Sequence, residues 1–288
     1  MLKLLQKLSE NIDVLKNLLK NHNYRSLTCV VYAQGSGRFG NIMLRNLACY
    51  VLSKKFNCRV IYEKMENIGI HLISTPKTQK VGKEIKLNDA DVFNVFQNRL
   101  QLKDNHLYHI HRYCQSPEIV GEIICEILNS ELLDNYKKYI ESKYSDFYTN
   151  NDIFIHYRAI DKENRKLHAL PNAETMLEVI DYIIKTKNVS NIYLSYDRKN
   201  DVINQILKVH KKIIDFSKKS ITETINFGSS RKYVLVSSGS FSFTIGLLAY
   251  INSSKIFVYS KSGIGWHPPF FKKLCEYDSE RYVDYDQI

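Results

Sequence analysis

The sequence lacks several features that would assign it to a class at once. No stretch approaches the roughly 20 consecutive apolar residues that a membrane-spanning helix needs. No low-complexity segment or repeat of fixed period is present, which excludes a repeat array. Lysine and arginine are nowhere dense enough to form a nucleic-acid-binding arm. The six cysteines contain no C-x-x-C pair and several lie in apolar runs, so we expect buried free thiols and a cytoplasmic, reducing location.

What is present is ordinary for a folded soluble protein. The chain has 288 residues, of which 44% are hydrophobic and 25% charged, and this length allows one large domain or two of usual size. Lysine plus arginine number 41 against 30 acidic residues, which gives a net charge of +11. This excess favours an anionic partner such as a nucleotide, a nucleic acid or an acidic surface. Lysines scattered over solvated helix faces would produce the same sum.

The pattern of the chain predicts three segments. Residues 1–24 read as an amphipathic helix with leucines and one isoleucine on one face. We expect this helix to pack on the body of the protein, with peripheral contact to a membrane surface or a partner as the alternative. We expect residues 25–149 to form an N-terminal Rossmann-like lobe and residues 150–288 to form a C-terminal one, whose tail returns over the surface or between the lobes.

Within both lobes, β-rich apolar runs alternate with helical patterns, which is typical of parallel α/β sheets. In the first lobe the pattern predicts strands at 27–33, 59–63 and 107–111 and helices at 41–56, 89–102 and 118–144. In the second lobe it predicts strands at 153–157, 191–195, 233–237 and 255–259 and helices at 173–185, 201–210 and 241–251.

The first chemical motif is a glycine-rich turn between a predicted strand and a predicted helix. Gly35, Gly37 and Gly40 satisfy G-x-G-x-x-G, and Glu63 ends the next strand, as in dinucleotide-binding proteins. Glycines let the backbone approach a phosphate, and the helix N-terminus supplies N–H donors. An NAD(P)-binding oxidoreductase is therefore one interpretation, and a tight turn without a ligand is another.

Further motifs favour a different family. The segment Gly37-Arg38-Phe39-Gly40-Asn41 resembles the G-R-[FL]-G-N segment of the nucleotide-sugar fucosyltransferases of the α-1,2, α-1,6 and protein O-fucosyl types. Residues 156–161 (HYRAID), 194–197 (LSYD) and 237–243 (SSGSFSF) are similar to that family's H-x-R-R-x-D, F-S-D-D and S-x-S-[ST]-F-S-W segments, in the same order. Chain length and motif order are most similar to the α-1,2-fucosyltransferases of glycosyltransferase family 11. Two departures are Ala159 in place of the second arginine and Phe243-Thr244 in place of the aromatic pair.

This resemblance implies an α/β fold of the GT-B type, with two Rossmann-like lobes facing a cleft. It implies that the lobe at 25–149 lies on the acceptor side and that the lobe at 150–288 binds the GDP-sugar. It implies transfer of L-fucose from GDP-β-L-fucose to a hydroxyl of a glycan acceptor, with inversion, α-1,2 linkage and no metal ion or other cofactor. A non-catalytic protein that binds carbohydrate or nucleic acid is a further alternative.

The chemistry explains these residue types. Transfer of a sugar from a nucleoside diphosphate develops negative charge on the leaving diphosphate, and a cation must meet it. The sequence has no convincing acidic pair to hold a divalent ion, whereas the guanidinium of Arg158 can bind phosphate oxygens in two places. Catalytic roles are expected for Arg158, Asn41 and Asp161, and donor binding is expected for Gly37, Arg38, Gly40, His156, Arg158, Asp197, Ser240, Phe241 and Ser242.

Each assignment has a structural alternative. Arg158 would instead form an ion pair with Asp161 or Asp197, and Asp197 would instead cap the following helix. His156 would be a hydrogen-bonded core residue, and Asn41 a first-turn helix residue only.

The general base stays open. Asp161 and Glu163 are both candidates, and a dissociative transition state would need no strong base.

Two other groups of residues are weak candidates for sites. The spacing of His106, His109 and His111 would place only two of them on one face of a strand, without a further metal ligand. The 20 tyrosines are dispersed, which indicates ordinary packing rather than base stacking on nucleic acid.

Overall fold

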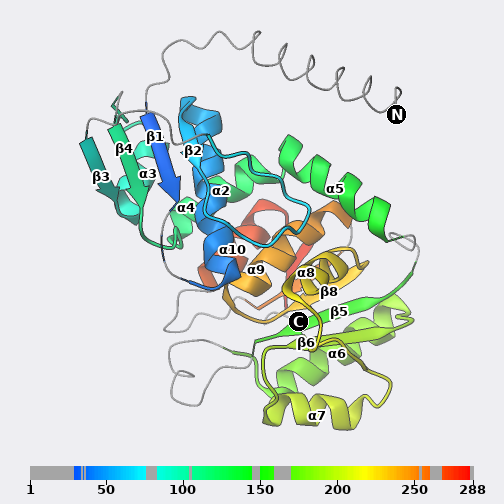
Figure 1. The fold of residues 1–288 in the computed structure, drawn as a ribbon. Coiled ribbons are helices and arrows are strands. Elements are labelled where there is room, and N and C mark those ends of the chain that lie inside the picture. The colour runs from blue at the N-terminus through cyan, green and yellow to red at the C-terminus, as the bar shows by residue number, and fades with distance from the viewer. Residues whose placement is uncertain are drawn as a thin grey trace, which may run out of the picture.

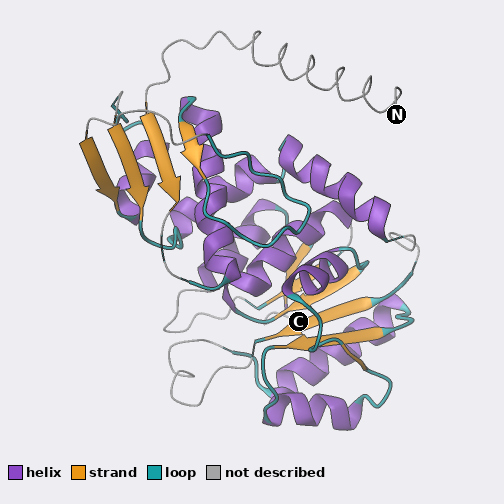
Figure 2. Cartoon of the chain, viewed as in Figure 1, coloured by secondary structure: helices purple, strands orange, loops and turns teal. Residues whose placement is uncertain are grey.

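A computed structural model describes residues 29–33, 35, 37–75, 83–103, 106–144, 150–158, 170–252, 255–259 and 268–285. Two separate sheets, each made of parallel strands, lie at opposite ends of the molecule with helices between and around them (Figures 1 and 2). The residues at 29–144 are called the N-terminal half and those at 150–285 the C-terminal half. The predicted helix at 1–24 lies outside the described residues.

The N-terminal half builds a four-stranded sheet in the order β2-β1-β4-β3. Its elements are β1 (Cys29–Ala33), α2 (Phe39–Phe56), β2 (Arg59–Ile61), β3 (Lys83–Leu87), α3 (Asp89–Phe96), β4 (His106–Ile110), α4 (Pro117–Ile127) and α5 (Glu131–Lys143). Because β1 pairs with β2 on one side and with β4 on the other, the strand order reverses between β1 and β4.

The C-terminal half builds a six-stranded sheet in the order β10-β9-β8-β5-β6-β7. Its elements are β5 (Ile153–Tyr157), α6 (Ala173–Lys187), β6 (Ile192–Tyr196), α7 (Asp201–Val209), β7 (Ile214–Asp215), α8 (Ile221–Ser229), β8 (Tyr233–Val236), α9 (Gly239–Leu248), a 3-10 helix (Ala249–Asn252), β9 (Ile256–Val258), α10 (Pro268–Tyr277) and β10 (Tyr282–Asp284). This is the doubly wound Rossmann order, and its switch point lies between β5 and β8.

Several elements were not predicted from the sequence, and each has a physical reason. Strand β3 lies at the edge of its sheet with mostly exposed side chains, so it lacks an apolar run. Strand β7 has two exposed residues only. Helix α8, helix α10 and strand β10 were also not predicted, and the predicted helix at 118–144 is two helices, the second of which begins after Ser130.

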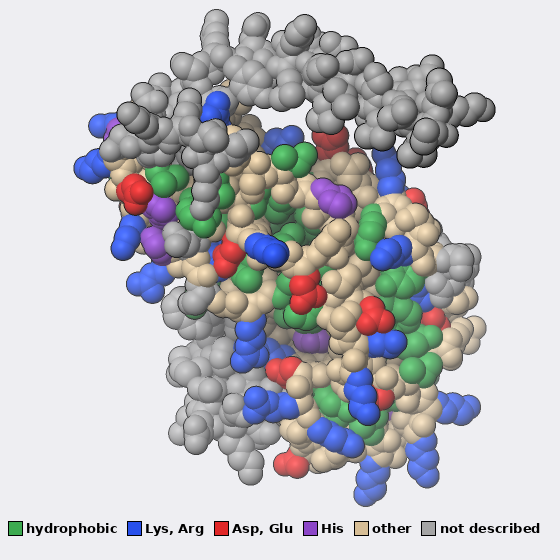
Figure 3. Space-filling view, viewed as in Figure 1, with side chains coloured by type: hydrophobic (Ala, Val, Ile, Leu, Met, Phe, Trp, Pro, Cys, Tyr) green, Lys and Arg blue, Asp and Glu red, His purple; other side chains and the backbone are tan. Residues whose placement is uncertain are grey.

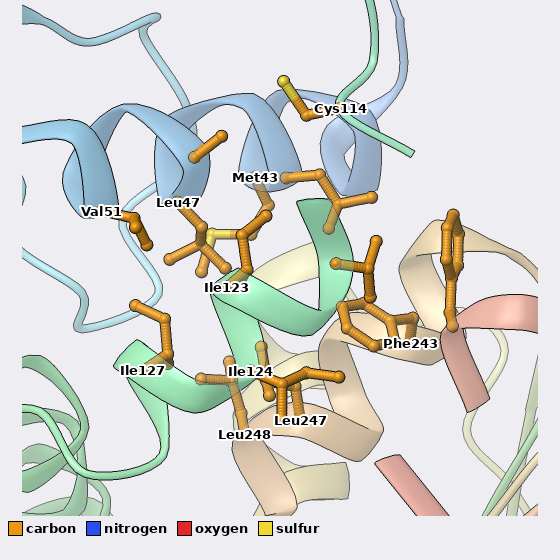
Figure 4. Packing of buried hydrophobic residues seen from close by; sticks show 14 of the residues in the cluster. Met43, Leu47, Val51, Cys114, Ile123, Ile124, Ile127, Phe243, Leu247 and Leu248 are labelled. Carbon is orange, nitrogen blue, oxygen red and sulfur yellow. The ribbon is translucent and has the colours of Figure 1, made fainter. Parts of the chain in front are cut away.

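One hydrophobic core joins the two halves. Met43, Leu47 and Val51 of α2 interlock with isoleucines of α4 and with Phe243 and Leu247 of α9 (Figure 4). Helix α10, from the end of the chain, packs against α4 of the N-terminal half. The shared core therefore fixes the position of one sheet relative to the other.

The positive charge is distributed mainly over the outer surface. Lys and Arg side chains surround the end of the molecule where α6 and α7 lie (Figure 3), and Lys185, Lys199, Lys208, Lys211 and Lys212 are exposed there. This distribution matches the expectation of lysines on solvated faces for part of the net charge. Within the described ranges, no helix combines the length and the apolar character needed to cross a bilayer.

Candidate active site

The candidate site is a cavity of about 590 Å³ between the two halves. Arg38 to Asn41, Arg112, Tyr113 and Gln115 line it from the N-terminal half, and residues that follow β5, β6, β7 and β8 line it from the C-terminal half. Both groups come from the carboxyl ends of strands, close to the two switch points of the strand order. Ligands of open α/β sheets bind at such positions.

The C-terminal wall is built where β5 and β8 end side by side. The Ser237 amide donates to the His156 carbonyl at 3.1 Å, and the Arg158 amide donates to the Ser237 hydroxyl at 2.9 Å. The Arg158 side chain then crosses directly over Gly239, where a Cβ would lie 2.9 Å from the Arg158 Cδ. Gly239 also has a φ of +95°, which favours glycine. Glycine at this position therefore lets the guanidinium lie against the first turn of α9.

Two helices begin at the cavity, and neither has a capping side chain at its N-terminus. Helix α9 has Ser238 as its N-cap and α2 has Arg38, and neither side chain accepts a bond from its helix. The Ser238 hydroxyl is also buried without a hydrogen-bond partner among the described residues. Asn or Ser side chains cap α3, α4, α6, α7 and α8. Helix α5 also lacks a capping side chain, but it contributes no residue to the cavity. The free N–H groups and positive ends of α2 and α9 are suited to an anion.

Gly40 and Asn41 join the two halves at this point. A Cβ on Gly40 would lie 2.5 Å from the Ser240 carbonyl carbon and 2.6 Å from the Phe241 nitrogen, so only glycine allows the two backbones to approach so closely. One residue later, the Asn41 Oδ1 accepts from the Ser240 hydroxyl and from the Gln115 Nε2, each at 2.8 Å. Asn41 is therefore more than a first-turn helix residue.

His156 is buried and also lines the cavity. Its Nδ1 lies 2.7 Å from the Ser242 Oγ, and its ring centroid lies 5.0 Å from that of Phe241. Burial, with a smaller contribution from the nearby charge of Arg158, lowers the pKa of His156 to about 3. The imidazole is consequently neutral near pH 7.

The charges that line the cavity are mostly positive. Arg38, Arg112, Arg158 and Lys219 are set against a single carboxylate, Asp197, among the described lining residues. Burial, and then the charge of Arg38, lower the pKa of Arg158, and Asp197 opposes this decrease. No ion pair joins Arg158 to a carboxylate in the part of the chain that the structure describes. An anion in the cavity would offset the repulsion between the two guanidinium groups.

Most of the predicted site residues meet in this cavity. They are Arg38, Gly40, Asn41, His156, Arg158, Asp197, Ser240 and Phe241. Ser242 lies beneath His156 with no exposed surface, and Gly37 packs against Asn41 and Tyr113 without lining the cavity. Asp161, Glu163 and Ala159 lie outside the described residues.

The structure disfavours two alternative interpretations from the sequence. Helix α7 is capped by Asn200, whose side chain accepts from the Ile203 amide at 3.0 Å, and not by Asp197. Glu63, which a dinucleotide site would use for a ribose, accepts two bonds from the buried Arg45, at 2.6 and 3.0 Å. The dinucleotide interpretation is therefore not favoured.

Seven lining residues were not found from the sequence: Arg112, Tyr113, Gln115, Ser217, Lys219, Ile221 and Thr224. The last four follow the short strand β7, whose two residues show no pattern. The one signal present was the capping box of Ser220 and Glu223, which marks the start of α8 beside the cavity.

The histidines at positions 106, 109 and 111, the weak metal candidate from the sequence, lie in and directly after β4. His109 stacks with His111 at 5.7 Å between centroids, and its Nε2 lies 3.4 Å from the Glu84 carboxylate. No group of three or more His, Cys, Asp or Glu side chains with metal-binding geometry occurs among the described residues.

Comparison with solved structures identifies the fold. POFUT1 in complex with GDP aligns over 80% of this chain and 98% of its own, with a TM-score of 0.50 and 8% sequence identity. The fold is of the GT-B type. Fucosyltransferase NodZ from Bradyrhizobium (TM-score 0.44, 14% identity, 77% of this chain and 94% of its own) and the S. aureus MnaA–UDP structure (0.42, 12%, 88% and 89%) also align, but too distantly to carry an argument. No family model and no curated protein matches the sequence.

The predicted fold class, two Rossmann-like lobes with a GT-B arrangement, is confirmed. The similarity extends to the fold alone, because identity with POFUT1 is 8%.

Proposed function

We propose that this GT-B-type protein is a glycosyltransferase that moves L-fucose from GDP-β-L-fucose to a glycan hydroxyl, with inversion and with α-1,2 linkage. The observation that carries the proposal is the position of Arg158 across Gly239, beside the uncapped N-terminus of α9 and at the switch point of a Rossmann sheet. This combination suits a diphosphate, and the structure of POFUT1 with similar fold was solved with GDP.

Departure of the diphosphate is the step that the C-terminal wall supports. As the bond from the sugar to the diphosphate breaks, negative charge develops on the leaving oxygen. The guanidinium of Arg158 and the N–H groups of α9 stabilise this charge. Arg38 adds a second cation from the facing half. These groups perform the role that a divalent ion has in metal-dependent transferases, so transfer proceeds without a metal ion.

His156 contributes as a neutral group. With a pKa of about 3 it carries no charge near pH 7, and it orders the wall through Ser242 and Phe241. A group with so low a pKa is a weak base, so we assign His156 to contact with the nucleotide rather than to the general base. Asp161 remains our candidate for receiving the acceptor proton.

The acceptor enters from the N-terminal half, where Asn41, Arg112 and Tyr113 line the cavity. We further propose a cytoplasmic location for the reaction. This is supported by the free thiols of Cys49, Cys114, Cys125 and Cys275.

Thermal unfolding with a panel of ligands tests the donor assignment. At a hundredfold excess over its Kd, a ligand specific for the folded state adds about 2.7 kcal/mol, or a rise in Tm of roughly 5–10 °C for a protein of this size. GDP and GDP-fucose should produce this rise in EDTA, and NAD and UDP should not. Stabilisation by NAD without any by GDP would refute the proposal.

Transfer itself is measured with GDP-fucose and a β-galactoside acceptor, by GDP release and by mass of the product. The anomeric configuration of the product reports inversion, and methylation analysis reports the linkage. If GDP binds but no acceptor is fucosylated, the nucleotide site stands and fucosyl transfer is refuted.

A further inference from the structure

Gln115 is a buried residue that lines the cavity, and its side chain is hydrogen-bonded to another side chain. It is 8% exposed, and its Nε2 donates to the Asn41 Oδ1 at 2.8 Å. The Ser240 hydroxyl donates a second hydrogen bond to the same oxygen, also at 2.8 Å. A carbonyl oxygen accepts through two lone pairs, so the Oδ1 of Asn41 is saturated by protein donors.

Saturation of Oδ1 leaves the amide nitrogen as the free end of Asn41. The Nδ2 makes no hydrogen bond with a described residue and lies beside Gly37, where a Cβ would come within 3.0 Å of it. Gly37 has a φ of +143°, so the turn before α2 uses a glycine at the point where the amide passes. Asn41 lines the cavity, and its Nδ2 therefore keeps two N–H donors that no described residue uses.

Gln115 is itself held in place by a carboxylate below it. Asp89, the first residue of α3, accepts the amide hydrogens of Cys114 and Gln115, each at 3.3 Å. Cys114 has a φ of +53°, an uncommon conformation for a residue with a side chain, and the two bonds to Asp89 offset its cost. These bonds hold the backbone of residues 114 and 115, and so they fix the position from which the Gln115 Nε2 donates to Asn41.

We propose that Gln115 is a positioning residue: by donating to Oδ1 it fixes the orientation of the Asn41 amide, so that the Nδ2 donors point at the fucosyl group or the acceptor oxygen. This inference rests on the proposed function. It connects α3, through Gln115 and Asn41, to the first turn of α9 in the other half.

The sharpest variant is Gln115→Glu, which keeps the shape but replaces the donor by an acceptor. A carboxylate facing Oδ1 is repelled, so the Asn41 amide turns over and presents its oxygen to the cavity. We expect kcat for fucosyl transfer to fall about 100-fold, because two donors are replaced by an acceptor at the reacting groups. Affinity for GDP should change less than threefold, since the diphosphate site at Arg158 is left intact.

Three further variants complete the test. Gln115→Ala, which removes the donor without adding a charge, should lower kcat about tenfold. Gln101→Glu makes the same chemical change at an exposed position, and Gln97→Ala removes a glutamine whose Nε2 bonds to Glu122 away from the cavity. Both controls should retain full activity and GDP affinity. A fall in kcat to the same degree in the controls would refute a specific role for Gln115.

Failure of the proposal is distinguishable from failure of the proposed function. The side-chain amide signals of Asn41, identified by their loss in Asn41→Ala, can be followed by NMR without any turnover. In Gln115→Glu these signals should shift, whereas Gln101→Glu should leave them in place. Unchanged signals, or transfer by Gln115→Glu within twofold of the wild type, would overturn the positioning role. Absence of transfer by the wild type, with the signals shifted as expected, would refute only the proposed function.

Discussion

The contact of Gly40 with the first turn of α9 allows one prediction to be worked from distances. In Gly40→Ala, the new Cβ would lie 2.5 Å from the Ser240 carbonyl carbon, whereas carbon atoms in contact are separated by about 3.5 Å. This carbon and the Phe241 nitrogen, at 2.6 Å, are backbone atoms, which cannot turn aside as a flexible side chain can. Helices α2 and α9 must therefore separate by about 1 Å.

This separation affects function more than stability. Overpacking of this kind costs about 1–3 kcal/mol, which corresponds to a fall in Tm of roughly 2–12 °C. The bond from the Ser240 hydroxyl to Asn41, now 2.8 Å, would lengthen to about 3.8 Å and be lost. Because a misplacement of 1 Å at a reacting centre can cost about 100-fold in rate, we expect kcat to fall by about that factor.

The matched control is Gly121→Ala in the interior of α4. Among the described residues, its Cβ would meet the Lys273 Cδ alone, at 3.7 Å, which is ordinary contact. Alanine is favoured over glycine inside a helix by about 1 kcal/mol, so this variant should melt slightly higher than the wild type and keep full activity. The two variants are compared by calorimetry and by GDP-fucose turnover. A Gly40→Ala protein with the Tm and kcat of the wild type would refute the close approach of α2 and α9.

Three further predictions concern the charged groups and the thiols. Arg158→Lys keeps the positive charge but loses the planar guanidinium that binds two phosphate oxygens, so the rate of transfer should fall about 100- to 1000-fold (2.7–4 kcal/mol) with Tm unchanged. Near-normal transfer by a folded Arg158→Ala protein would remove Arg158 from the mechanism. Because the pKa of His156 is lowered from 6.5 to about 3, the unfolded chain binds a proton on this residue at a higher pH than the folded protein does. The stability that neutral His156 contributes should therefore be complete above pH 6.5 and should decline as the pH falls toward 3. When Tm is measured against pH, its decrease over this range should be smaller in His156→Gln. Alkylation of the denatured, unreduced protein should modify all six cysteines, and mass spectrometry that finds two or more blocked in disulfides would contradict a reducing location.

The sequence predicted the site residues that follow strongly apolar strands. His156 lies near the end of β5, and Arg158, Asp197 and Ser240 follow β5, β6 and β8. Parallel pairing brings the carboxyl ends of these strands together. Because an apolar run of β-branched and aromatic residues identifies a buried strand, the polar residues at its end can be grouped from the sequence alone.

The residues that sequence analysis missed depend on contacts between distant segments. Gln115 reaches the cavity because β4 lies beside β1 and because Asp89, 26 residues earlier, holds its amide. Lys219 follows a strand of two exposed residues, which leaves no hydrophobic pattern to recognise. The positive φ of Cys114, before Gln115, is adopted without a glycine, and the capping box of Ser220 and Glu223 marks a helix start beside Lys219 but not a site.

Gly40 shows that a correct motif can have a different physical cause. Its place in G-x-G-x-x-G indicated close approach of a phosphate, yet its nearest neighbours are the backbone atoms of residues about 200 positions later. A glycine motif specifies that something approaches the backbone closely, and only the fold decides whether this is a ligand or the other half of the protein.

The closeness of α2 and α9 also has an electrostatic consequence. Two helix N-termini carry partial charges of the same sign, and here neither is neutralised by a capping side chain while Arg38 and Arg158 add two full charges to the same cavity. The shared hydrophobic core of α2, α4 and α9 must offset this repulsion in the free protein. An anion bound between the two helix ends would remove this repulsion, and the diphosphate of the proposed donor is such an anion. Binding of the donor and contact between the two halves should therefore strengthen each other, because each reduces the same unfavourable interaction.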